Sequence, residues 1–598
     1  MKRWRFAALL CLALLVPYAC EKDQPEHDEP PVDQTTNPQE PEGGKEDPNE
    51  QKPEDPPADT TPVKLKGAVI GTLQSVNYDT GQSSSTVNTR DKAFDGNFDT
   101  YFASYNRSRT WVGMDLGAPH VITRVGCSPR ISQEGRVELA LFEGANQADF
   151  SDALPLAIVK EKGQPRVMQY IDINCSRGFR YVRYVGPNDA RCNVSEVEFY
   201  GYKASGDDTQ LCQLTNLPTV VINTEGGKEI TSKKEYVNAN VYIISEGGTN
   251  LLSTALTGVR GRGNASWGFP KKPYRIKFAE KQNPLGAPSK DKSWTLINNY
   301  GDKTLMRNIL AFEVSRRVGM VYTPFCTPVD LVLNGEYQGC YQFCDQVEVG
   351  EGRVPAKDGY FIEIDAYAYN EDVYFYSSKG IPVTVKYPKD DEITAAQKTY
   401  IQNFFGKMET AVFSTGYANA TSGYRKYLDV DSFLRNFIVG EFCGNTDTYW
   451  SVNMYKDAGE GVFFTGPVWD YDLAFENDNR TYPINNLSGY IYATNGSVAD
   501  DDVRKMVTRI VKNDAAAHAR LIELWDEARP KLSDLNAYVD ETAALLEESQ
   551  QLNFKRWPIL NQYVHQNPKA YGSYAAEVSA VKTYITGRLT RFDELVRK

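Results

Sequence analysis

The sequence predicts a multidomain protein in which an all-β sandwich precedes an α+β domain with a helical C-terminal part. The chain has 598 residues, several times the length of an average domain. Between residues 65 and 203, short segments of alternating apolar and polar residues are separated by Gly, Asn, Asp and Ser, a pattern typical of a β-sandwich. From residue 208 onward, strand-like segments alternate with segments of helical spacing, and residues 499–598 are mostly helical in pattern.

The first 20 residues have the pattern of a secretory signal peptide. Three basic residues precede the apolar run AALLCLALLV, which is too short to span a bilayer. Cys20 follows Ala19 and precedes an acidic segment, so it resembles the acylated cysteine of a bacterial lipoprotein, although Pro17 departs from the usual aliphatic residue. Ordinary cleavage near Ala19 is the alternative. We expect an exported lipoprotein at the outer membrane or cell surface of a Gram-negative bacterium, which touches the membrane through its lipid anchor only.

Residues 21–62 form an acidic, proline-rich segment. It contains 14 acidic residues, three lysines and 10 prolines, and almost no apolar residues that a core could bury. This composition predicts a disordered, extended tether. Its net charge of −11 accounts for nearly all of the −12 of the whole chain, so the predicted folded part is close to neutral. The charge distribution therefore predicts no nucleic-acid partner.

Residues 65–203 contain the strand candidates WVGMDLG, VITRVGCSPR, VELALFEG, FRYVRYVG and SEVEFYGY. Together with the loop AFDGNFDTYFAS, they resemble a discoidin-type or carbohydrate-binding jelly roll of the galactose-binding-like fold. Members of this fold often hold a structural Ca²⁺ ion in that loop. The resemblance implies oxygen donors, which Ca²⁺ requires, at Asp95, Asn97, Thr100 and Glu198. A tight Asp-Gly turn without metal is the alternative.

Such jelly rolls bind ligands through aromatic and arginine side chains on the loops at one end. Candidate side chains here are Tyr105, Arg107, Arg109 and Arg130. The resemblance therefore implies a glycan or surface polymer as ligand. Side chains that only pack within the domain are the alternative.

A basic, glycine-rich segment lies near the start of the second domain. In RGRGNASWGFPKKPYRIKF (260–278), glycines allow close approach of the backbone, and Arg262, Arg275 and Lys277 are three of six cations. A glycine-rich turn beside a basic strand can hold phosphate groups, because amide N–H groups and lysines point at the oxygens. The alternation in YRIKF places Arg275 and Lys277 on one face. A surface hairpin without a ligand is the alternative.

The segment from Cys443 to Phe475 carries acidic and amide side chains in a loop, strand, loop order. Phosphoryl transfer needs a carboxylate that takes or orients the proton of the acceptor hydroxyl, and oxygen ligands for Mg²⁺. Protein kinases supply an Asp, then an Asn, and a metal-binding Asp after the next hairpin. Asp447, Asn453 and Asp470 follow this order, although Asn453 comes six rather than five positions after Asp447, and WDYD replaces DFG. Acid-rich loops that only cap helices or form turns are the alternative.

This acidic segment and four blocks upstream of it resemble the spore-coat CotH kinase family. NTDTYWSVNMY and PVWDYDLAF are preceded, in the order of the family, by RGRGNASWGFPKKPYRIKF, WTLINNYGDKTLMRN, LVLNGEYQGCYQFCDQVEV and DGYFIEID. The resemblance covers most of residues 208–598. It implies an atypical protein-kinase-like fold that uses ATP with Mg²⁺ or Mn²⁺.

The same resemblance implies roles for residues of the acidic segment. Asp447 corresponds to the catalytic base, and Asn453 and Asp470 correspond to metal ligands. Asp472 either orients Asp470 or holds a second metal ion.

The resemblance also implies a lysine that pairs with the phosphates. Lys277 is its preferred counterpart, with Arg262 and Arg275 as alternatives. Glu313 could pair with this cation, as the helix glutamate of kinases does, or with a neighbouring arginine instead. Asp345 stands where the family usually has a glutamate, which puts the role of that position in doubt.

Two functions follow from these observations. The first is transfer of phosphate from ATP with Mg²⁺ to a Ser or Thr hydroxyl at the cell surface, on a protein substrate or on the chain itself. The second is a glycan- or surface-binding lipoprotein whose kinase-like domain is structural and inactive. The intact set of Asp447, Asn453 and Asp470 favours the first, and Asp345 with the N-terminal module favours the second.

Overall fold

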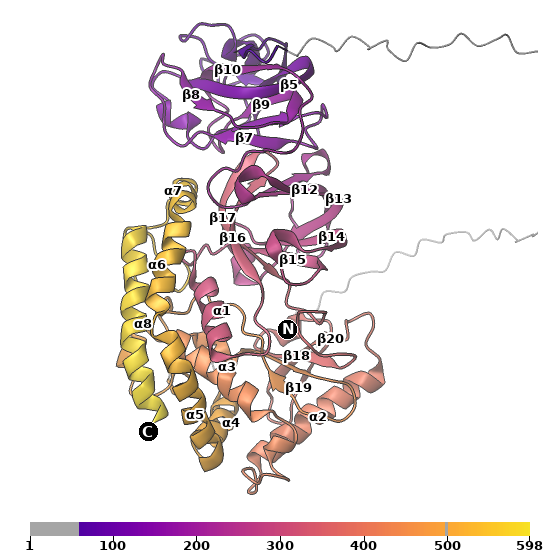
Figure 1. Cartoon of the computed structure of the whole chain (residues 1–598), viewed down its shortest axis with the longest axis vertical. Helices are drawn as coiled ribbons and strands as arrows, with labels where there is room; N and C mark the ends of the chain where they lie inside the picture. The colour runs from indigo at the N-terminus through magenta and orange to yellow at the C-terminus, as the bar shows by residue number, and fades with distance from the viewer. Residues whose placement is uncertain (1–58, 495, 497–499) are drawn as a thin grey trace, which may run out of the picture. The chain divides into compact units, whose positions relative to one another are not determined.

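The computed structural model describes residues 59–494, 496 and 500–598. The predicted signal peptide, the predicted lipidation site Cys20 and residues 21–58 of the predicted tether lie outside the described residues. The described chain forms a β-sandwich, a closed β-barrel, a five-stranded sheet and eight α-helices (Figure 1). The sandwich comes first and most of the helices come last, which confirms the predicted fold class.

One long strand, β5 (Trp111–Pro129), lies at the centre of the eight-stranded sheet that forms the sandwich. The other strands of this sheet are β1 (Val63–Lys64), β2 (Ala68–Gly71), β6 (Leu141–Ala145), β7 (Leu154–Ile158), β8 (Gln169–Asp172), β9 (Gly178–Val185) and β10 (Val194–Lys203), and β3 (Ser75–Val76) pairs separately with β4 (Ser83–Ser84). The N-terminal part of β5 pairs with β2 and β9, and β9 continues to β6 and β7. The C-terminal part of β5 pairs with β8 and β10, and β10 continues to β1. These strands enclose one apolar core.

Seven strands close the barrel in the order β11-β12-β13-β14-β15-β17-β16. They are β11 (Thr219–Thr224), β12 (Val237–Ser245), β13 (Asn250–Gly261), β14 (Tyr274–Gln282), β15 (Asp291–Ile297), β16 (Cys326–Leu333) and β17 (Glu336–Asp345). Parallel pairing of β11 with β16 completes the ring. Alternate apolar residues such as Val259, Ile276 and Trp294 fill the interior, so their polar neighbours on the same strands face outward.

The five-stranded sheet has the order β19-β20-β18-β21-β22 and is antiparallel throughout. Its strands are β18 (Tyr360–Asp365), β19 (Tyr374–Tyr376), β20 (Pro382–Tyr387), β21 (Ser451–Lys456) and β22 (Phe464–Thr465). β18 lies between β20 and β21, although β20 and β21 are far apart in the sequence. The sheet therefore brings side chains of both neighbours to the edges of β18.

The helices are α1 (Arg307–Val318), α2 (Ala395–Phe413), α3 (Val430–Cys443), α4 (Asp501–Val511), α5 (Ala515–Leu532), α6 (Leu535–Leu545), α7 (Glu547–Arg556) and α8 (Tyr574–Val596). α3 contacts α1, α5 and α8, and Figure 1 shows these helices side by side. Their apolar faces belong to the largest core of the described chain. Thr394 begins α2 with a capping box, because its hydroxyl accepts from Gln397 N while the Gln397 side chain returns to Thr394 N.

Aspartate side chains order the starts of α1 and α3. The buried Asp302 carboxylate accepts from the backbone N–H groups of Thr304 and Arg307 and holds a turn ahead of α1, which begins at Arg307. α3 is capped by Asp429, whose side chain accepts from Ser432 N at 2.8 Å. Asp431 lies in the first turn of α3.

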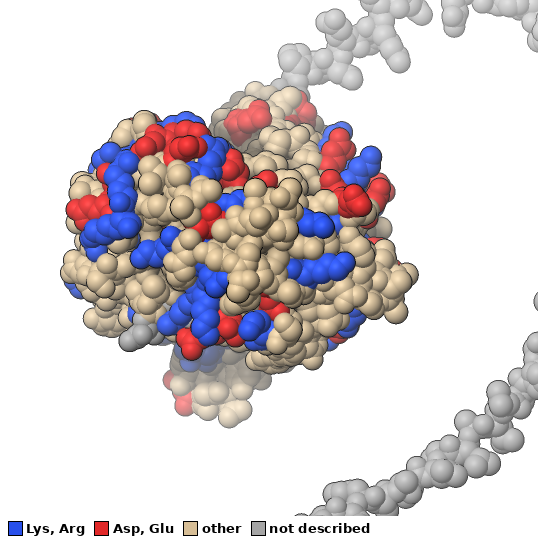
Figure 2. All heavy atoms as spheres, turned by 90° about the horizontal axis from the view of Figure 1, so that it is seen from below, with Lys and Arg blue, Asp and Glu red and all other residues tan. Residues whose placement is uncertain are grey.

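The surface carries charges of both signs. On the face drawn in Figure 2, basic and acidic side chains are interspersed. Many form exposed ion pairs such as Arg520–Asp431 at 2.8 Å, and pairs of this kind contribute little stability. Among the described residues, no helix is both long and apolar enough to span a membrane.

A buried ion pair connects α3 with α8. The Glu441 carboxylate accepts from the hydroxyl of Tyr449 at 2.8 Å and from the backbone N–H groups of Ile491 and Tyr492 at 2.8 and 3.1 Å. Arg588 of α8 donates to the carbonyl oxygen of Glu441 through Nε at 3.0 Å and Nη2 at 2.6 Å, and both side chains are fully buried. Glu441 thus joins helix α3, the loop after it, the segment at 491–492 and the last helix.

We expect Glu441→Ala to lower the free energy of unfolding by about 3–5 kcal/mol, because Arg588 would keep a buried charge without its partner. Arg520→Met is the matched control, since loss of the exposed Arg520–Asp431 pair should cost less than about 1 kcal/mol. Chemical denaturation followed by circular dichroism measures both values. Equal losses in the two variants would contradict the role given to Glu441.

Candidate functional site

Asp447 lies in a short turn that follows α3. The helix ends at Gly444, whose φ of +74° suits glycine, and the next turn (Thr446–Tyr449) begins where Asn445 Oδ1 accepts from Asp447 N at 3.3 Å. Both carboxylate oxygens of Asp447 accept from Arg480, at 2.7 and 2.9 Å. Arg480 also binds the fully buried Asp478 at 2.5 Å. The predicted base is therefore held in one orientation by an arginine that a second carboxylate anchors.

Asp470 lies after β22 in an unusual backbone conformation. Its φ is +66°, in the left-handed region that non-glycine residues rarely adopt. Hydrogen bonds hold this conformation: Asn308 of α1 accepts from Tyr471 N at 2.7 Å, and Asn445 donates to the carbonyl oxygen of Asp470 at 3.4 Å. The conformation costs free energy, which these contacts from the surrounding protein offset.

The carboxylates of Asp470 and Asp472 lie in an environment of excess negative charge. Desolvation by the surrounding protein raises the pKa of Asp470 although its side chain is open to solvent, and the Asp447 and Glu363 charges raise it further against the opposing effect of Arg262. Desolvation and then the charge of Asp470 raise the pKa of Asp472 well above its ordinary value. The structure thus brings the predicted base and both predicted metal-binding aspartates within electrostatic range of one another.

Asn453 lies on β21, and its side-chain oxygen already has a partner. Asn453 Nδ2 donates to the carbonyl oxygen of Pro467 at 2.9 Å, and Oδ1 accepts from Lys386 Nζ of β20 at 3.1 Å. Lys386 also binds Glu363 of β18 at 2.5 Å, and Ser451 donates to the other oxygen of Glu363. The predicted metal ligand Asn453 therefore contacts an ammonium group.

Sequence reasoning missed Glu363, Lys386 and Arg480 as members of this site. Glu363 and Lys386 could have been found from their positions in the mostly apolar strands YFIEID and PVTVKY. Charged residues are seldom buried unless they are paired, so each of the two indicates a partner. His565 was also missed, and it lies close enough to Asp470 to lower the pKa of that carboxyl. No local sequence pattern pointed to Arg480 or His565.

The three predicted phosphate-binding cations occupy different environments. Arg262 extends toward the acidic loop, with its guanidinium 5.5 Å from the ring centre of Trp469 and close enough to Asp470 to affect it. Arg275 binds Glu348 at 3.2 Å. Lys277 is exposed and has no ion pair within the described residues. Of the three, Arg262 belongs to the site.

Of the two partners predicted for Glu313, the structure shows the neighbouring arginines. Glu313 binds Arg316 and Arg317 at 2.9 and 2.7 Å, because these residues lie one turn away on the same helix. In the glycine-rich turn, the ring of Trp267 packs directly against Gly261. Asp345 accepts from Tyr322 and from Phe325 N at 3.0 and 2.9 Å.

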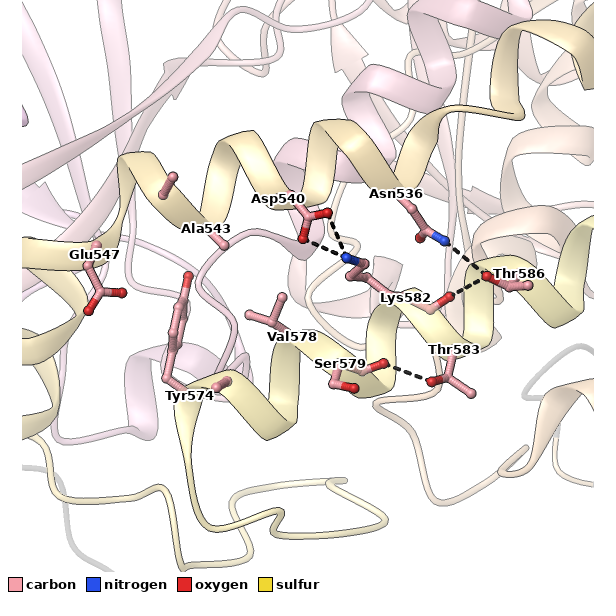
Figure 3. A pocket seen from close by; sticks show the side chains of 12 residues that line it. Asn536, Asp540, Ala543, Glu547, Tyr574, Val578, Ser579, Lys582, Thr583 and Thr586 are labelled. Atoms are coloured by element: carbon pink, nitrogen blue, oxygen red, sulfur yellow. Dashed lines mark hydrogen bonds and ion pairs between the residues drawn. The ribbon is translucent and has the colours of Figure 1, made fainter.

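Within the described ranges, no group of three or more His, Cys, Asp or Glu side chains has the geometry of a metal site. A shallow hollow of about 690 Å³ lies between α6 and α8, away from the acidic residues. Figure 3 shows two pairs among its polar side chains, with Lys582 bound to Asp540 at 2.6 Å and Asn536 donating to Thr586 at 2.9 Å. The buried hydroxyl of Tyr574, which also lines the hollow, has no hydrogen-bond partner among the described residues. The acidic loops, not this hollow, carry the candidate chemistry.

The loop that carries the predicted calcium ligands Asp95, Asn97 and Thr100 is held by its own hydrogen bonds, and the glutamate beside it is Glu196, not the predicted Glu198. Thr100 Oγ1 donates to Asp95 at 2.8 Å and to the carbonyl oxygen of Asn97 at 2.9 Å. Glu198 lies elsewhere, bound to Lys64 at 2.6 Å and to Tyr170 at 2.7 Å. Glu196 faces Asp95 instead. It is buried, and its Oε1 has no hydrogen-bond partner.

Three loops of the sandwich form an aromatic platform around Arg130. The Arg130 guanidinium lies 3.8 Å from the ring centre of Tyr101 and 4.7 Å from that of Tyr78. Tyr78 is exposed, as is Tyr105. Of the other predicted loop residues, Arg107 binds Asp189 at 3.1 Å, and Arg109 binds Glu229 of the segment after β11.

A family model described as "CotH kinase protein" matches residues 259–591, more than half of the chain. The match spans the barrel from β13 onward, the five-stranded sheet and the helices into α8. The chain belongs to the CotH kinase family, which confirms the resemblance seen in its sequence. It is also 27% identical over 226 residues to the inner spore coat protein H of Bacillus subtilis (strain 168). That alignment covers 36% of this chain and 58% of the relative, so the chain spans little more than half of the relative's length.

Solved structures similar to the N-terminal region include carbohydrate-binding proteins. A CBM62 module of Clostridium thermocellum Xyl5A is 35% identical, covers 24% of this chain and 99% of its own, and has a TM-score of 0.22. A fucolectin from striped bass (Morone saxatilis) serum is 22% identical over 22% of this chain and 45% of its own, with a TM-score of 0.19. The fold of the sandwich rests on its observed strand pairing, not on these low scores.

Glu196 should make the stability of the metal-free protein depend on pH. Burial and the adjacent Asp95 carboxyl raise the pKa of Glu196 to about 7, whereas an unfolded glutamate titrates near about 4.3. Between these values the folded state holds a proton that the unfolded state has released, so stability falls as pH rises. With chelator present, we expect Tm to fall between pH ~5 and pH ~7.5 and Glu196→Gln to reduce this fall.

Glu198→Gln is the matched control. Contacts with Lys64 and two tyrosines outweigh desolvation and lower the pKa of Glu198, so this residue titrates below the tested range. A pH dependence unchanged in Glu196→Gln would contradict the assignment.

Proposed function

We propose that the protein transfers phosphate from ATP to a Ser or Thr hydroxyl, on another protein or on itself, and that it is exported and lipid-anchored through Cys20. The observation that carries the kinase proposal is the convergence of Asp447 and Asp470 from the two ends of the β21–β22 hairpin, where the Asn445 side chain accepts from Asp447 N and donates to the carbonyl oxygen of Asp470, in a member of the CotH kinase family. Phosphoryl transfer depends mainly on positioning and electrostatics. Arg480 holds the Asp447 carboxylate, and hydrogen bonds at Tyr471 N and at the Asp470 carbonyl oxygen hold the backbone that carries Asp470.

Asp447 is the group that accepts the proton of the acceptor hydroxyl. The side chain is 39% exposed, so a hydroxyl can reach it. Arg480 fixes its orientation and adds positive charge where a transferred phosphoryl group would carry negative charge. The anchoring of Arg480 by the buried Asp478 keeps that charge in place without a substrate.

The donor set at Asp470 and Asp472 fits a divalent cation. These are hard oxygen donors, and their pKa values are raised first by desolvation and then by the charges of neighbouring carboxylates. Mg²⁺ or Mn²⁺, when bound with ATP, would neutralise the phosphates and orient them. Arg262 extends from the barrel toward the same carboxylates and provides a cation for the phosphates from the opposite side.

The test follows labelled phosphate from ATP to the protein or a generic acceptor with Mg²⁺ or Mn²⁺. Asp447→Ala should reduce transfer by about 10²–10⁴-fold and leave nucleotide binding intact, because a base acts in the chemical step. Asp470→Ala should abolish metal-dependent nucleotide binding. Asp431→Asn, which changes an exposed carboxylate on α3, is the control and should behave as wild type.

A folded wild-type protein that binds no nucleoside triphosphate would refute the kinase proposal. In that case the inactive, structural kinase-like domain, the second function considered from the sequence, would stand.

For the sandwich, we propose carbohydrate binding supported by a structural Ca²⁺ ion. The platform of Tyr78, Tyr101 and Arg130 presents an exposed aromatic face with a nearby donor, which suits the stacking and hydrogen bonding of a sugar ring. The unpartnered oxygen of buried Glu196 beside Asp95 fits a cation, with Thr100 and Asn97 contributing the neighbouring oxygens.

We expect Tyr78→Ala to abolish retardation of the protein in gels that contain the bound polysaccharide, identified beforehand on a glycan array, because stacking is lost. Tyr563→Ala, which changes an exposed tyrosine outside the sandwich, is the control. Ca²⁺ should raise Tm more at pH 8 than at pH 5.5, since Glu196 must be ionised to bind it. A blank array, or a Tm that neither Ca²⁺ nor chelator changes, would refute the respective part of the proposal.

A further inference from the structure

We propose that Lys386 takes the place of a second divalent cation at the kinase-like site, so that the protein binds one metal ion per nucleotide, and that Lys386, not Lys277, is the lysine that contacts the phosphates. The inference rests on the proposed kinase function and goes beyond it. It starts from an ammonium group found where the sequence predicts a metal ion.

The position of Lys386 is set by three neighbouring strands. β20 pairs with β18, and β18 pairs with β21, so Lys386, Glu363 and Asn453 come to one place. Lys386 Nζ lies 2.5 Å from Glu363 Oε2 and 3.1 Å from Asn453 Oδ1. A cation is thus already present between a carboxylate and an amide oxygen, the two donor types expected to bind Mg²⁺.

The amide of Asn453 cannot readily turn toward another cation. Its Nδ2 donates to the carbonyl oxygen of Pro467 at 2.9 Å, and its backbone oxygen accepts from Gly466 N at 2.7 Å. These bonds direct Oδ1 toward Lys386. A divalent ion at Asn453 would have to displace the ammonium group or lie beside it, and like charges at that distance repel strongly.

The charges of the surrounding residues are consistent with a single metal ion. Glu363 is paired with Lys386, and Asp447 is paired with Arg480. Asp470 and Asp472 remain, with no ion pair of their own among the described residues. Two adjacent carboxylates and the phosphates of a nucleotide supply a full donor set for one Mg²⁺ ion.

Lys386 is also better placed than Lys277 to reach a phosphate. Its ammonium has three donor hydrogens, of which Glu363 and Asn453 use two. The Lys386 side chain is 30% exposed. Its partner Glu363 lies close enough to Asp470 to raise the pKa of that carboxyl. Lys277 projects from the outside of the barrel, opposite to the buried Ile276 and Phe278.

The first test counts metal ions in the wild-type protein. Mn²⁺ is titrated by electron paramagnetic resonance in the presence of saturating adenylyl imidodiphosphate. We expect one Mn²⁺ per bound nucleotide. Two tightly bound Mn²⁺ ions per nucleotide would overturn the inference, and this measurement needs no variant that could fail to fold.

The second test compares two lysines by the affinity for the same nucleotide with Mn²⁺. Lys386→Met should weaken binding by about tenfold or more, because one charge-assisted hydrogen bond to phosphate is lost. Lys386→Arg should retain part of the affinity, and the matched control Lys277→Met should bind as wild type. If Lys386→Met does not fold, the double variant Lys386→Met with Glu363→Gln is measured instead, because it also removes the Glu363 charge that the single variant leaves unpaired.

The outcomes separate this inference from the kinase proposal. Normal nucleotide binding by wild type, with an unchanged Lys386→Met and a weakened Lys277→Met, would overturn the assignment of Lys386 and leave the kinase proposal intact. Absence of nucleotide binding in folded wild type would refute both.

Discussion

The buried pair of Glu441 and Arg588 is the contact on which the candidate site depends. A carboxylate without water must have all its lone pairs satisfied, and here the partners come from the loop of Asp447, from the segment at 491–492 and from α8. This requirement fixes the end of α3, and therefore the start of the turn that carries Asp447. The C-terminal helix, far away in sequence, thus supports the loop that carries Asp447.

Positive charges inside the site are supplied by side chains with separate anchors. Arg480 is held by Asp478, and Lys386 is held by Glu363 and Asn453. Each anchor offsets the desolvation of the cation before any ligand arrives. The site is therefore pre-organised, and a ligand would not have to supply the free energy of ordering these long side chains.

Local features could be predicted from the sequence, whereas contacts between distant segments could not. The ends of α1 and α3 at Gly319 and Gly444 follow from the left-handed conformation that glycine permits. The order of Asp447, Asn453 and Asp470 can likewise be read from the sequence. Lys386 was not, because only the pairing of β20 with β18 brings it to Asn453. Glu196 was missed in favour of Glu198 because a β-bulge beside Glu196 changes the direction of the side chains that follow.

Asp470 combines a carboxylate with a backbone conformation that glycine adopts more easily. Glycine at this position would relieve the strained φ of +66° and stabilise the fold. The same change would remove the charge that the site is built around. Stability and charge thus place opposite demands on this one position, because the residue type that best suits the backbone conformation carries no carboxylate.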